Sequence, residues 1–192
     1  PYADTMGIAV YADFDHYWGQ RSKKLRDNIK RYQARCAKAG IALGFREAAD
    51  PVAVASAFET YATIESAGWK GKQGTAISLD NDQGKFYADA LVRMAHRGEA
   101  KIFELLADDV VIASRIAVFS GGHGVFLKTT YDETFKKHSP GRILLFKTLE
   151  RLFSNSELRR LEFYTKVNPD QAQWSTDTRP INHLEFFSSP VL

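Results

Sequence analysis

Three consecutive runs of β-forming residues in the middle of the chain constrain its fold more than any other feature. Valine, isoleucine, phenylalanine and threonine are frequent in each run, and these side chains suit a pleated, partly buried surface. Asp108-Asp109 separates the first two runs, and a glycine-rich turn over residues 121–124 separates the second from the third. Short links of this kind join antiparallel neighbours. We therefore predict a three-stranded meander over residues 101–107, 110–120 and 125–131.

Helical patterns surround the predicted meander. Leu25, Ile29, Tyr32 and Cys36 recur at the spacing of one helix face, so residues 18–39 are predicted to form a helix. Further helices are expected over residues 51–65, between residues 82 and 98 with Phe86 facing inward, and over residues 140–153. Short strands are expected over residues 7–11, 41–46, 161–164 and 181–188. This order predicts a mixed α/β (α+β) domain, a mostly antiparallel sheet flanked by helices.

The positive charge of the chain is concentrated in one segment. The 192 residues carry a formal net charge of +3, yet residues 20–38 hold eight basic side chains against Asp27 alone. This segment is either an amphipathic helix with a solvated charged face or a surface for a polyanion, such as tRNA or an anionic lipid surface. The basic residues are Arg21, Lys23, Lys24, Arg26, Lys30, Arg31, Arg35 and Lys38.

Length and composition exclude several classes of protein. A chain of 192 residues fits one domain, and 44% hydrophobic content excludes wholesale disorder. No apolar run approaches the roughly 18 residues of a membrane-spanning helix. Cys36 is the single cysteine and lies on an apolar helix face, so we expect a core thiol in a reducing, cytoplasmic compartment. No spacing of histidine, cysteine or carboxylate residues indicates a metal site.

The start of the helix after the meander is the most informative candidate site. Ser139 is a residue type that caps helices, proline suits the first helical position, and Gly141 lets a ligand approach the backbone. Free N–H groups and the positive dipole end favour an anion there, and Arg142 adds a charge. An ordinary capped helix is the alternative interpretation. The acid–base candidates are Tyr131, Asp132, Glu133, His138 and Tyr164.

Two motifs resemble a known family. The stretch Glu65-Ser66-Ala67-Gly68-Trp69-Lys70-Gly71 resembles a signature of acetyltransferase-like proteins of cellulose biosynthesis, the CelD type, within the GNAT superfamily. Residues 128–135, which read Lys-Thr-Thr-Tyr-Asp-Glu-Thr-Phe, are similar to the family's Lys-x-x-Tyr-Asp-x-x-Phe pattern, and Ser139-Pro140-Gly141 follows as in the family. The resemblance extends over about residues 13–187.

The resemblance implies a GNAT fold and an N-acyltransferase that uses acetyl-CoA or another acyl-CoA, with no metal. In such enzymes the pyrophosphate of the donor lies on the helix after the fourth strand. Carried onto this chain, that position is the helix start with Ser139, Gly141 and Arg142. Tyr131 and Asp132 are then the candidates for proton transfer.

The resemblance also suggests an acceptor and a place in a longer protein. Trp69, Lys70 and Lys128 would contact a small-molecule or glycan amine, in polysaccharide or cell-envelope biosynthesis. Longer relatives hold two such domains in tandem, so we expect this chain to be a C-terminal domain with an N-terminal GNAT-like domain in front. Residues 1–39 would be an N-terminal segment with the basic connecting helix, and residues 40–192 the acyltransferase domain.

Two alternatives stay open, because the usual GNAT loop, Arg/Gln-x-x-Gly-x-Gly/Ala, is absent. Fem-type peptidoglycan aminoacyltransferases have a turn similar to Ser139-Pro140-Gly141 and take their acyl group from aminoacyl-tRNA. The basic helix over residues 20–38 would suit such a donor. A non-catalytic accessory domain in polysaccharide biosynthesis is the other alternative.

Overall fold

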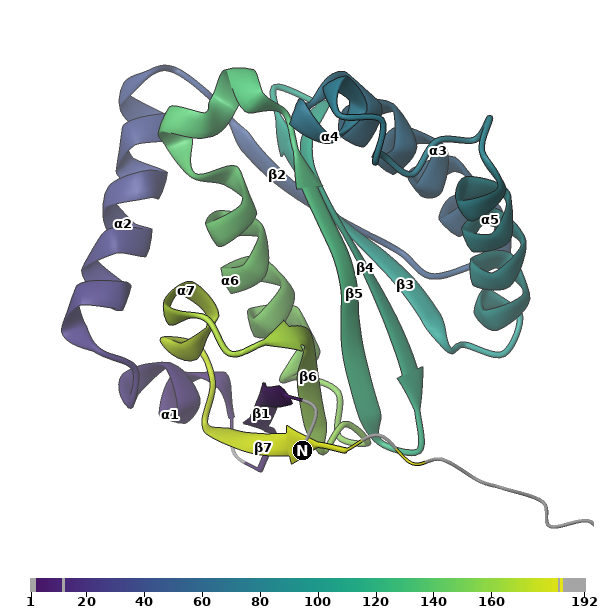
Figure 1. The fold of residues 1–192 in the computed structure, drawn as a ribbon. Coiled ribbons are helices and arrows are strands. Elements are labelled where there is room, and N and C mark those ends of the chain that lie inside the picture. Colours follow the sequence, from purple (N-terminus) through teal and green to yellow (C-terminus); the bar gives the residue numbers. More distant parts are fainter. Residues whose placement is uncertain (1–2, 12, 183, 185–192) are drawn as a thin grey trace, which may run out of the picture.

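One sheet combines strands from both ends of the chain. The computed structural model describes residues 3–11, 13–182 and 184. Within these residues, seven strands form a mixed sheet in the order β2-β3-β4-β5-β6-β1-β7 (Figure 1). Every neighbouring pair is antiparallel except β5 and β6, which are parallel. The strands are β1 (Ala3–Ala9), β2 (Leu43–Ala48), β3 (Ala100–Ala107), β4 (Val110–Ser120), β5 (His123–Tyr131), β6 (Arg160–Lys166) and β7 (Asp177–Ile181).

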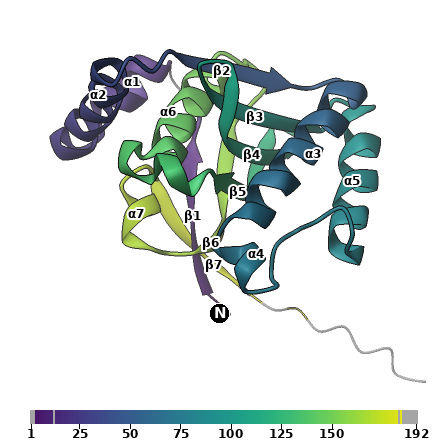
Figure 2. The same cartoon turned by 90° about the horizontal axis from the view of Figure 1, so that it is seen from above.

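Helices cover both faces of the sheet, which confirms the predicted fold class. Helices α3 and α5 lie on one face, whereas α6 lies on the other with α2 packed against its outer side (Figure 2). Each face has its own apolar core: Leu144 and Leu149 lie in one, and Phe58 and Leu91 in the other. The helices are α1 (Phe14–Gly19), α2 (Lys23–Lys38), α3 (Pro51–Ala67), α4 (Trp69–Lys72), α5 (Asp82–Ala95), η1 (Glu133–His138, a 3-10 helix), α6 (Pro140–Leu152) and α7 (Pro169–Ala172).

The predicted meander is present as β3, β4 and β5. Its two hairpin turns each contain a pair of residues with positive φ, Asp108-Asp109 at 48° and 68° and Gly121-Gly122 at 54° and 80°. Two-residue turns of this conformation have a twist that matches the flanking strands. The acidic pair and the glycine pair therefore mark hairpins, as the sequence indicates.

Strand β5 separates from β6 halfway along its length. Their parallel pairing runs only from His123 opposite Arg160 to Phe126 opposite Phe163, although β5 continues to Tyr131. On the other side of β5, the register with β4 shifts so that Leu127 is an extra residue. Such a bulge bends a strand and increases its twist. The outer edge of residues 127–131 therefore has no strand partner among the described residues.

The N-terminal residues belong to the same sheet and core as the rest of the chain. Strand β1 lies between β6 and β7, and Leu25, Ile29 and Cys36 of α2 are buried. The apolar stripe of the basic helix is thus confirmed. The prediction of one continuous helix over residues 18–39 is wrong, because the chain breaks after α1 and Ser22 accepts a hydrogen bond from the N–H of Leu25 at 3.2 Å to begin α2.

Two further predictions differ from the structure. Phe86 points outward and is 68% exposed, because it lies about 140° around α5 from the buried Leu91. The last strand ends at Ile181 and pairs with β1, and residues 183 and 185–188 of the predicted strand lie outside the described residues. No helix in the described part of the chain is long and apolar enough to cross a membrane.

Candidate functional site

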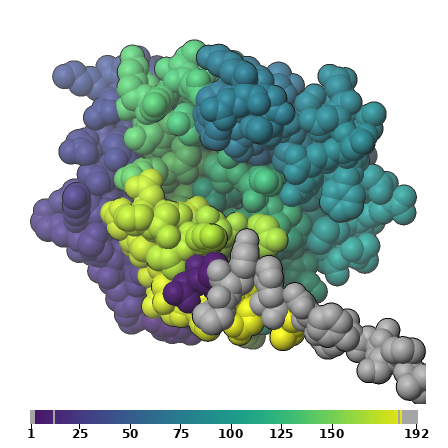
Figure 3. Space-filling model, in the orientation of Figure 1, coloured from purple at the N-terminus to yellow at the C-terminus, as the bar shows by residue number. Residues whose placement is uncertain are grey.

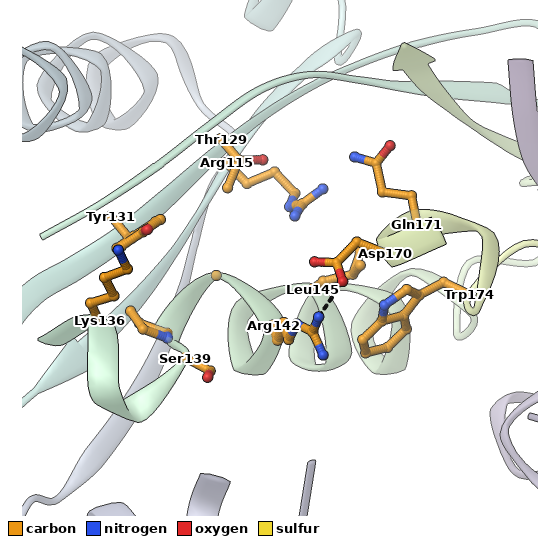
Figure 4. Close-up of a pocket in the computed structure, with 12 residues that line it drawn as sticks. Arg115, Thr129, Tyr131, Lys136, Ser139, Arg142, Leu145, Asp170, Gln171 and Trp174 are labelled. Atoms are coloured by element: carbon orange, nitrogen blue, oxygen red, sulfur yellow. Dashed lines mark hydrogen bonds and ion pairs between the residues drawn. The ribbon is translucent and has the colours of Figure 1, made fainter. Parts of the chain in front are cut away.

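The separation of β5 from β6 opens a cleft at the start of α6. The cleft has a volume of about 510 Å³ and lies between the end of β5, the first turns of α6 and the short helix α7 (Figure 4). In the space-filling view, α7, η1 and α4 surround a recessed area of the surface (Figure 3). The lining residues are Arg115, Thr129, Tyr131, Lys136, Ser139, Pro140, Gly141, Arg142, Leu145, Asp170, Gln171 and Trp174.

The start of α6 presents an unpaired backbone donor to this cleft. Ser139 has φ 55° and ψ 49°, and its carbonyl accepts from the N–H groups of Arg142 and Ile143 at 3.1 and 3.3 Å. Pro140 has no N–H, so Gly141 carries the first free amide of the helix, and that amide has no acceptor among the described residues. Such an amide, at the positive end of a 13-residue helix, is suited to an anion.

The predicted capping role of Ser139 is wrong. A capping serine has extended backbone, which directs its hydroxyl back to the amides of the first turn. Ser139 has a left-handed backbone instead, and its side chain makes no cap hydrogen bond. The residue still lines the cleft, together with Gly141 and Arg142. The structure therefore brings the three predicted donor-binding residues to one cavity.

Cationic groups line the same part of the cleft. Lys136 lies in η1, directly before the helix start. Arg142 forms an ion pair with the exposed carboxylate of Asp170 in α7, and its second terminal nitrogen lies 3.5 Å from the hydroxyl of Tyr32 in α2. Exposed ion pairs contribute little to stability, so an anionic ligand can compete with Asp170 for Arg142.

A second, smaller cavity lies beside the opposite side of the β5 end. Its volume is about 40 Å³, and Thr129 and Tyr131 line both this cavity and the cleft, so the end of β5 is the wall between them. The backbone N–H of Trp69 donates to Glu133 at 3.0 Å, which joins α4 to η1. The lining residues are Glu65, Gly68, Trp69, Lys70, Thr129, Thr130, Tyr131 and Glu133.

Glu65 organises the floor of this smaller cavity. Its side chain is 2% exposed, accepts from the hydroxyl of Tyr61 at 2.7 Å and from the N–H of Ile77 at 2.8 Å, and forms an ion pair with Lys70. Burial, followed by the hydrogen bond to Glu65, raises the pKa of Tyr61 far above its usual value of 10. The phenol therefore stays protonated and holds the carboxylate in place.

The structure leaves two predicted site residues outside both cavities. Asp132 accepts from the backbone N–H and the hydroxyl of Thr134 at 2.8 and 2.7 Å, so its carboxylate caps η1. Lys128 lies in β5 opposite Ile116 and lines neither cavity. Trp69 and Lys70 both line the smaller cavity, and Tyr131 lines both cavities.

Sequence reasoning missed two buried charged residues of the site. Arg115 stands alone as a charge in the apolar run of β4 and lines the cleft, where it is 5% exposed. Glu65 is the first residue of the Glu65–Gly71 motif, and nothing in the local sequence indicates that its carboxylate is buried. The sequence feature that could have indicated Arg115 is a lone arginine at the centre of a predicted buried strand, because arginine is rarely buried without a binding partner.

Comparisons with known proteins agree with this architecture. A family model described as an acetyltransferase (GNAT) domain matches residues 23–172. No curated protein gave a significant match to the chain. Among solved structures, FemX superposes with a TM-score of 0.62 at 10% identity, over 88% of this chain and 54% of FemX. This chain therefore spans about half the length of FemX.

Two solved chains that match over nearly their whole length show the same fold. A possible acetyltransferase from Clostridium difficile 630 superposes with a TM-score of 0.56 at 13% identity, over 76% of this chain and 99% of that protein. AAC(6')-Iy, solved with a bisubstrate analogue of CoA, gives 0.51 at 13% identity, over 77% and 99%. At these identities the likeness shows the fold alone. The match of the family model over most of the chain shows the family, and the chain belongs to the acetyltransferase (GNAT) domain family.

Proposed function

We propose that the protein is an N-acyltransferase that transfers an acyl group from acyl-CoA to an amine. The observation that carries this proposal is the separation of β5 from β6 beside the open start of α6. A thioester donor needs an extended channel for its amide-containing arm and an anion site for its phosphates. The unpaired edge of residues 127–131 can pair with the arm, and the free amide of Gly141 can bind a phosphate.

The donor's phosphates would lie at the mouth of the cleft. The amide of Gly141 donates there, and Lys136 and Arg142 add positive charge. Gly141 also leaves space, because a Cβ built on it would meet only the Tyr131 ring, at 3.8 Å. The open cleft argues against the accessory-domain alternative, in which side chains would fill this space.

The amine acceptor would enter through the smaller cavity across the end of β5. Trp69 is 52% exposed and offers an aromatic face to a sugar or an ammonium group. Glu133 lines the cavity beside it and can attract a cationic amine. These two side chains suit a glycan or small-molecule amine, and we retain Lys70 as the residue that holds Glu65 in place.

Tyr131 is the residue best placed to move a proton. The amine nitrogen attacks the thioester carbonyl, a C–N bond forms, the C–S bond breaks, and the proton released by the amine balances the departing thiolate. Tyr131 lines both cavities, so its phenol can donate to a thiolate in the cleft. Asp132 is the weaker candidate, because its carboxylate already accepts two hydrogen bonds from Thr134.

The biological setting that we propose follows from the family resemblance and the donor. The CelD-like motif around Gly68-Trp69-Lys70-Gly71 favours a role in polysaccharide or cell-envelope biosynthesis. Use of acyl-CoA would place the protein in the cytoplasm. The half-length match to FemX agrees with a tandem protein in which an N-terminal GNAT-like domain precedes this one.

Aminoacyl-tRNA is the second candidate donor, favoured by the surface of α2. Six of its basic side chains are exposed, whereas the opposite face of the helix is buried. A charged helix face of this kind can bind a phosphate backbone. The exposed residues are Lys23, Lys24, Lys30, Arg31, Arg35 and Lys38.

Calorimetry with acetyl-CoA tests the choice of donor. We expect binding to the wild-type chain and to Gly141→Ala, because a methyl group fits beside Tyr131. Gly141→Trp should fill the cleft mouth and weaken binding at least 10-fold. Absence of heat with the wild-type chain, together with tRNA binding that falls steeply with salt, would contradict the acyl-CoA proposal and favour the second donor.

A further inference from the structure

Arg115 is a buried cation without an anionic partner. Its side chain extends from β4 into the cleft, where it is 5% exposed (Figure 4). None of its nitrogens donates a hydrogen bond or forms an ion pair among the described residues, and its Nε is wholly buried. Its one specific contact is the ring of Phe126, whose centroid lies 4.8 Å from the guanidinium carbon. Burying a charge in this way is costly unless something compensates it.

The guanidinium remains charged despite its burial. Desolvation lowers the pKa of Arg115 to about 10, which still leaves the side chain protonated at neutral pH. Arg160, by comparison, has carboxylate partners: it donates to Glu162 at 2.5 Å and to Asp177 at 3.0 Å. Among the described residues, no carboxylate forms an ion pair with Arg115. Arg115 is thus available to pair with an anion that enters the cleft.

The position of Arg115 along the cleft indicates which part of a ligand it meets. The backbone of Arg115 lies opposite Thr129 of β5, and its guanidinium lies over the ring of Phe126, the last residue of β5 that pairs with β6. The start of α6 lies at the other end of the unpaired edge, next to Tyr131. Arg115 and Tyr131 line the same cleft, so a donor whose thioester reacts beside Tyr131 can extend the far end of its acyl chain to the guanidinium.

We propose that Arg115 selects an acyl donor whose acyl chain ends in a carboxylate, the CoA thioester of a dicarboxylic acid. This inference rests on the proposed function and names the substrate class of the same site. A guanidinium binds a carboxylate through two parallel hydrogen bonds, and the low polarity of the buried position strengthens them. In the structure the carboxylate of Asp170 pairs with Arg142 and not with Arg115.

Binding of three probes to matched variants tests this assignment. Calorimetry with succinyl-CoA, acetyl-CoA and CoA is performed on the full chain, on Arg115→Met and on Arg115→Lys. Arg93→Met, which removes an exposed arginine of α5, is the control for net charge. A thermal melt of each variant verifies folding, and Arg115→Met is expected to fold because it replaces an unpaired buried charge with an apolar chain of similar length.

We expect the wild-type chain and Arg93→Met to bind succinyl-CoA about 10- to 100-fold more tightly than acetyl-CoA, the range of a charge-assisted pair. Arg115→Met should abolish this preference and leave acetyl-CoA binding within about 3-fold, whereas Arg115→Lys should retain part of the preference. Equal binding of all three probes by the wild-type chain would overturn the inference while leaving the proposed function intact. An equal loss of affinity for all three probes in Arg115→Met would overturn it too, and would assign Arg115 to the donor's phosphates.

Failure of every probe to bind the wild-type chain would overturn both the inference and the proposed function.

Discussion

At the scale of single residues, the site depends on groups whose surroundings differ from what their types suggest. Serine commonly caps helices, but Ser139 has a left-handed backbone and does not cap. Arginine is commonly exposed, but Arg115 is buried in the central part of a strand. Neither property follows from local sequence, because both depend on how α6 and β5 pack together. The free amide of Gly141 was predictable, since Pro140 has no N–H and a glycine lets a ligand approach the backbone.

The buried side chain of His138, next to the site, should make the stability of the fold depend on pH. The side chain is 4% exposed and its Nδ1 has no partner among the described residues. Burial, then the nearby Lys137 and Arg35, lowers the pKa of His138 below its usual 6.5. Below about pH 6.5 the unfolded chain therefore binds a proton that the folded chain resists, so stability falls as the pH falls and is fully restored above that value.

Urea unfolding of the wild-type chain and His138→Gln between pH 5 and 8 measures this effect. We expect the difference in unfolding free energy between the two proteins to be constant above about pH 6.5 and to shift in favour of the variant as the pH is lowered. A difference that stays constant down to pH 5 would show that His138 is not held neutral by its surroundings.

At the scale of elements, a close backbone contact explains the glycine at position 71. A Cβ on Gly71 in α4 would lie 1.7 Å from the carbonyl oxygen of Ser66, at the end of α3. Residues 69–72 can turn back on α3 only because this position has no side chain. The turn places Trp69 and Lys70 at the smaller cavity. The motif therefore encodes a backbone path as well as side chains.

Gly71→Ala should destabilise the fold and disturb the acceptor side. We expect a loss of about 1–3 kcal/mol in urea unfolding, the usual cost of overpacking. Gly19→Ala is the matched control, because nothing lies within 4 Å of a Cβ at that position. Equal stability of Gly71→Ala and Gly19→Ala would contradict the close approach of α4 to α3.

Element types could be predicted more completely than the geometry that creates the site. The meander and the helices before and after it follow from hydrophobic period and turn residues. The separation of β5 from β6 does not, because it depends on the extra residue Leu127 and on where a distant strand stops pairing. Phe86 was misplaced because the face of α5 that packs on the core carries Tyr87 and Leu91, and Phe86 lies about 140° around the helix from Leu91.

At the scale of the whole molecule, the sheet places two cavities on either side of the end of β5. Residues of β4, α6 and α7 line the cleft, and residues of α3, α4 and η1 line the smaller cavity. Strand β1 completes the sheet between β6 and β7, so the N-terminal residues are part of the unit that holds the cleft. Such an arrangement lets a donor and an acceptor approach one reaction point from opposite sides.

The most direct measurement of this account is the amide NMR spectrum of the chain titrated with acetyl-CoA. Seating of the phosphates on α6 predicts a large shift of the Gly141 amide, with smaller shifts along residues 127–131 and none on the exposed face of α5, for example at Asp89. A spectrum in which the Gly141 amide does not move at saturating acetyl-CoA would contradict the central claim.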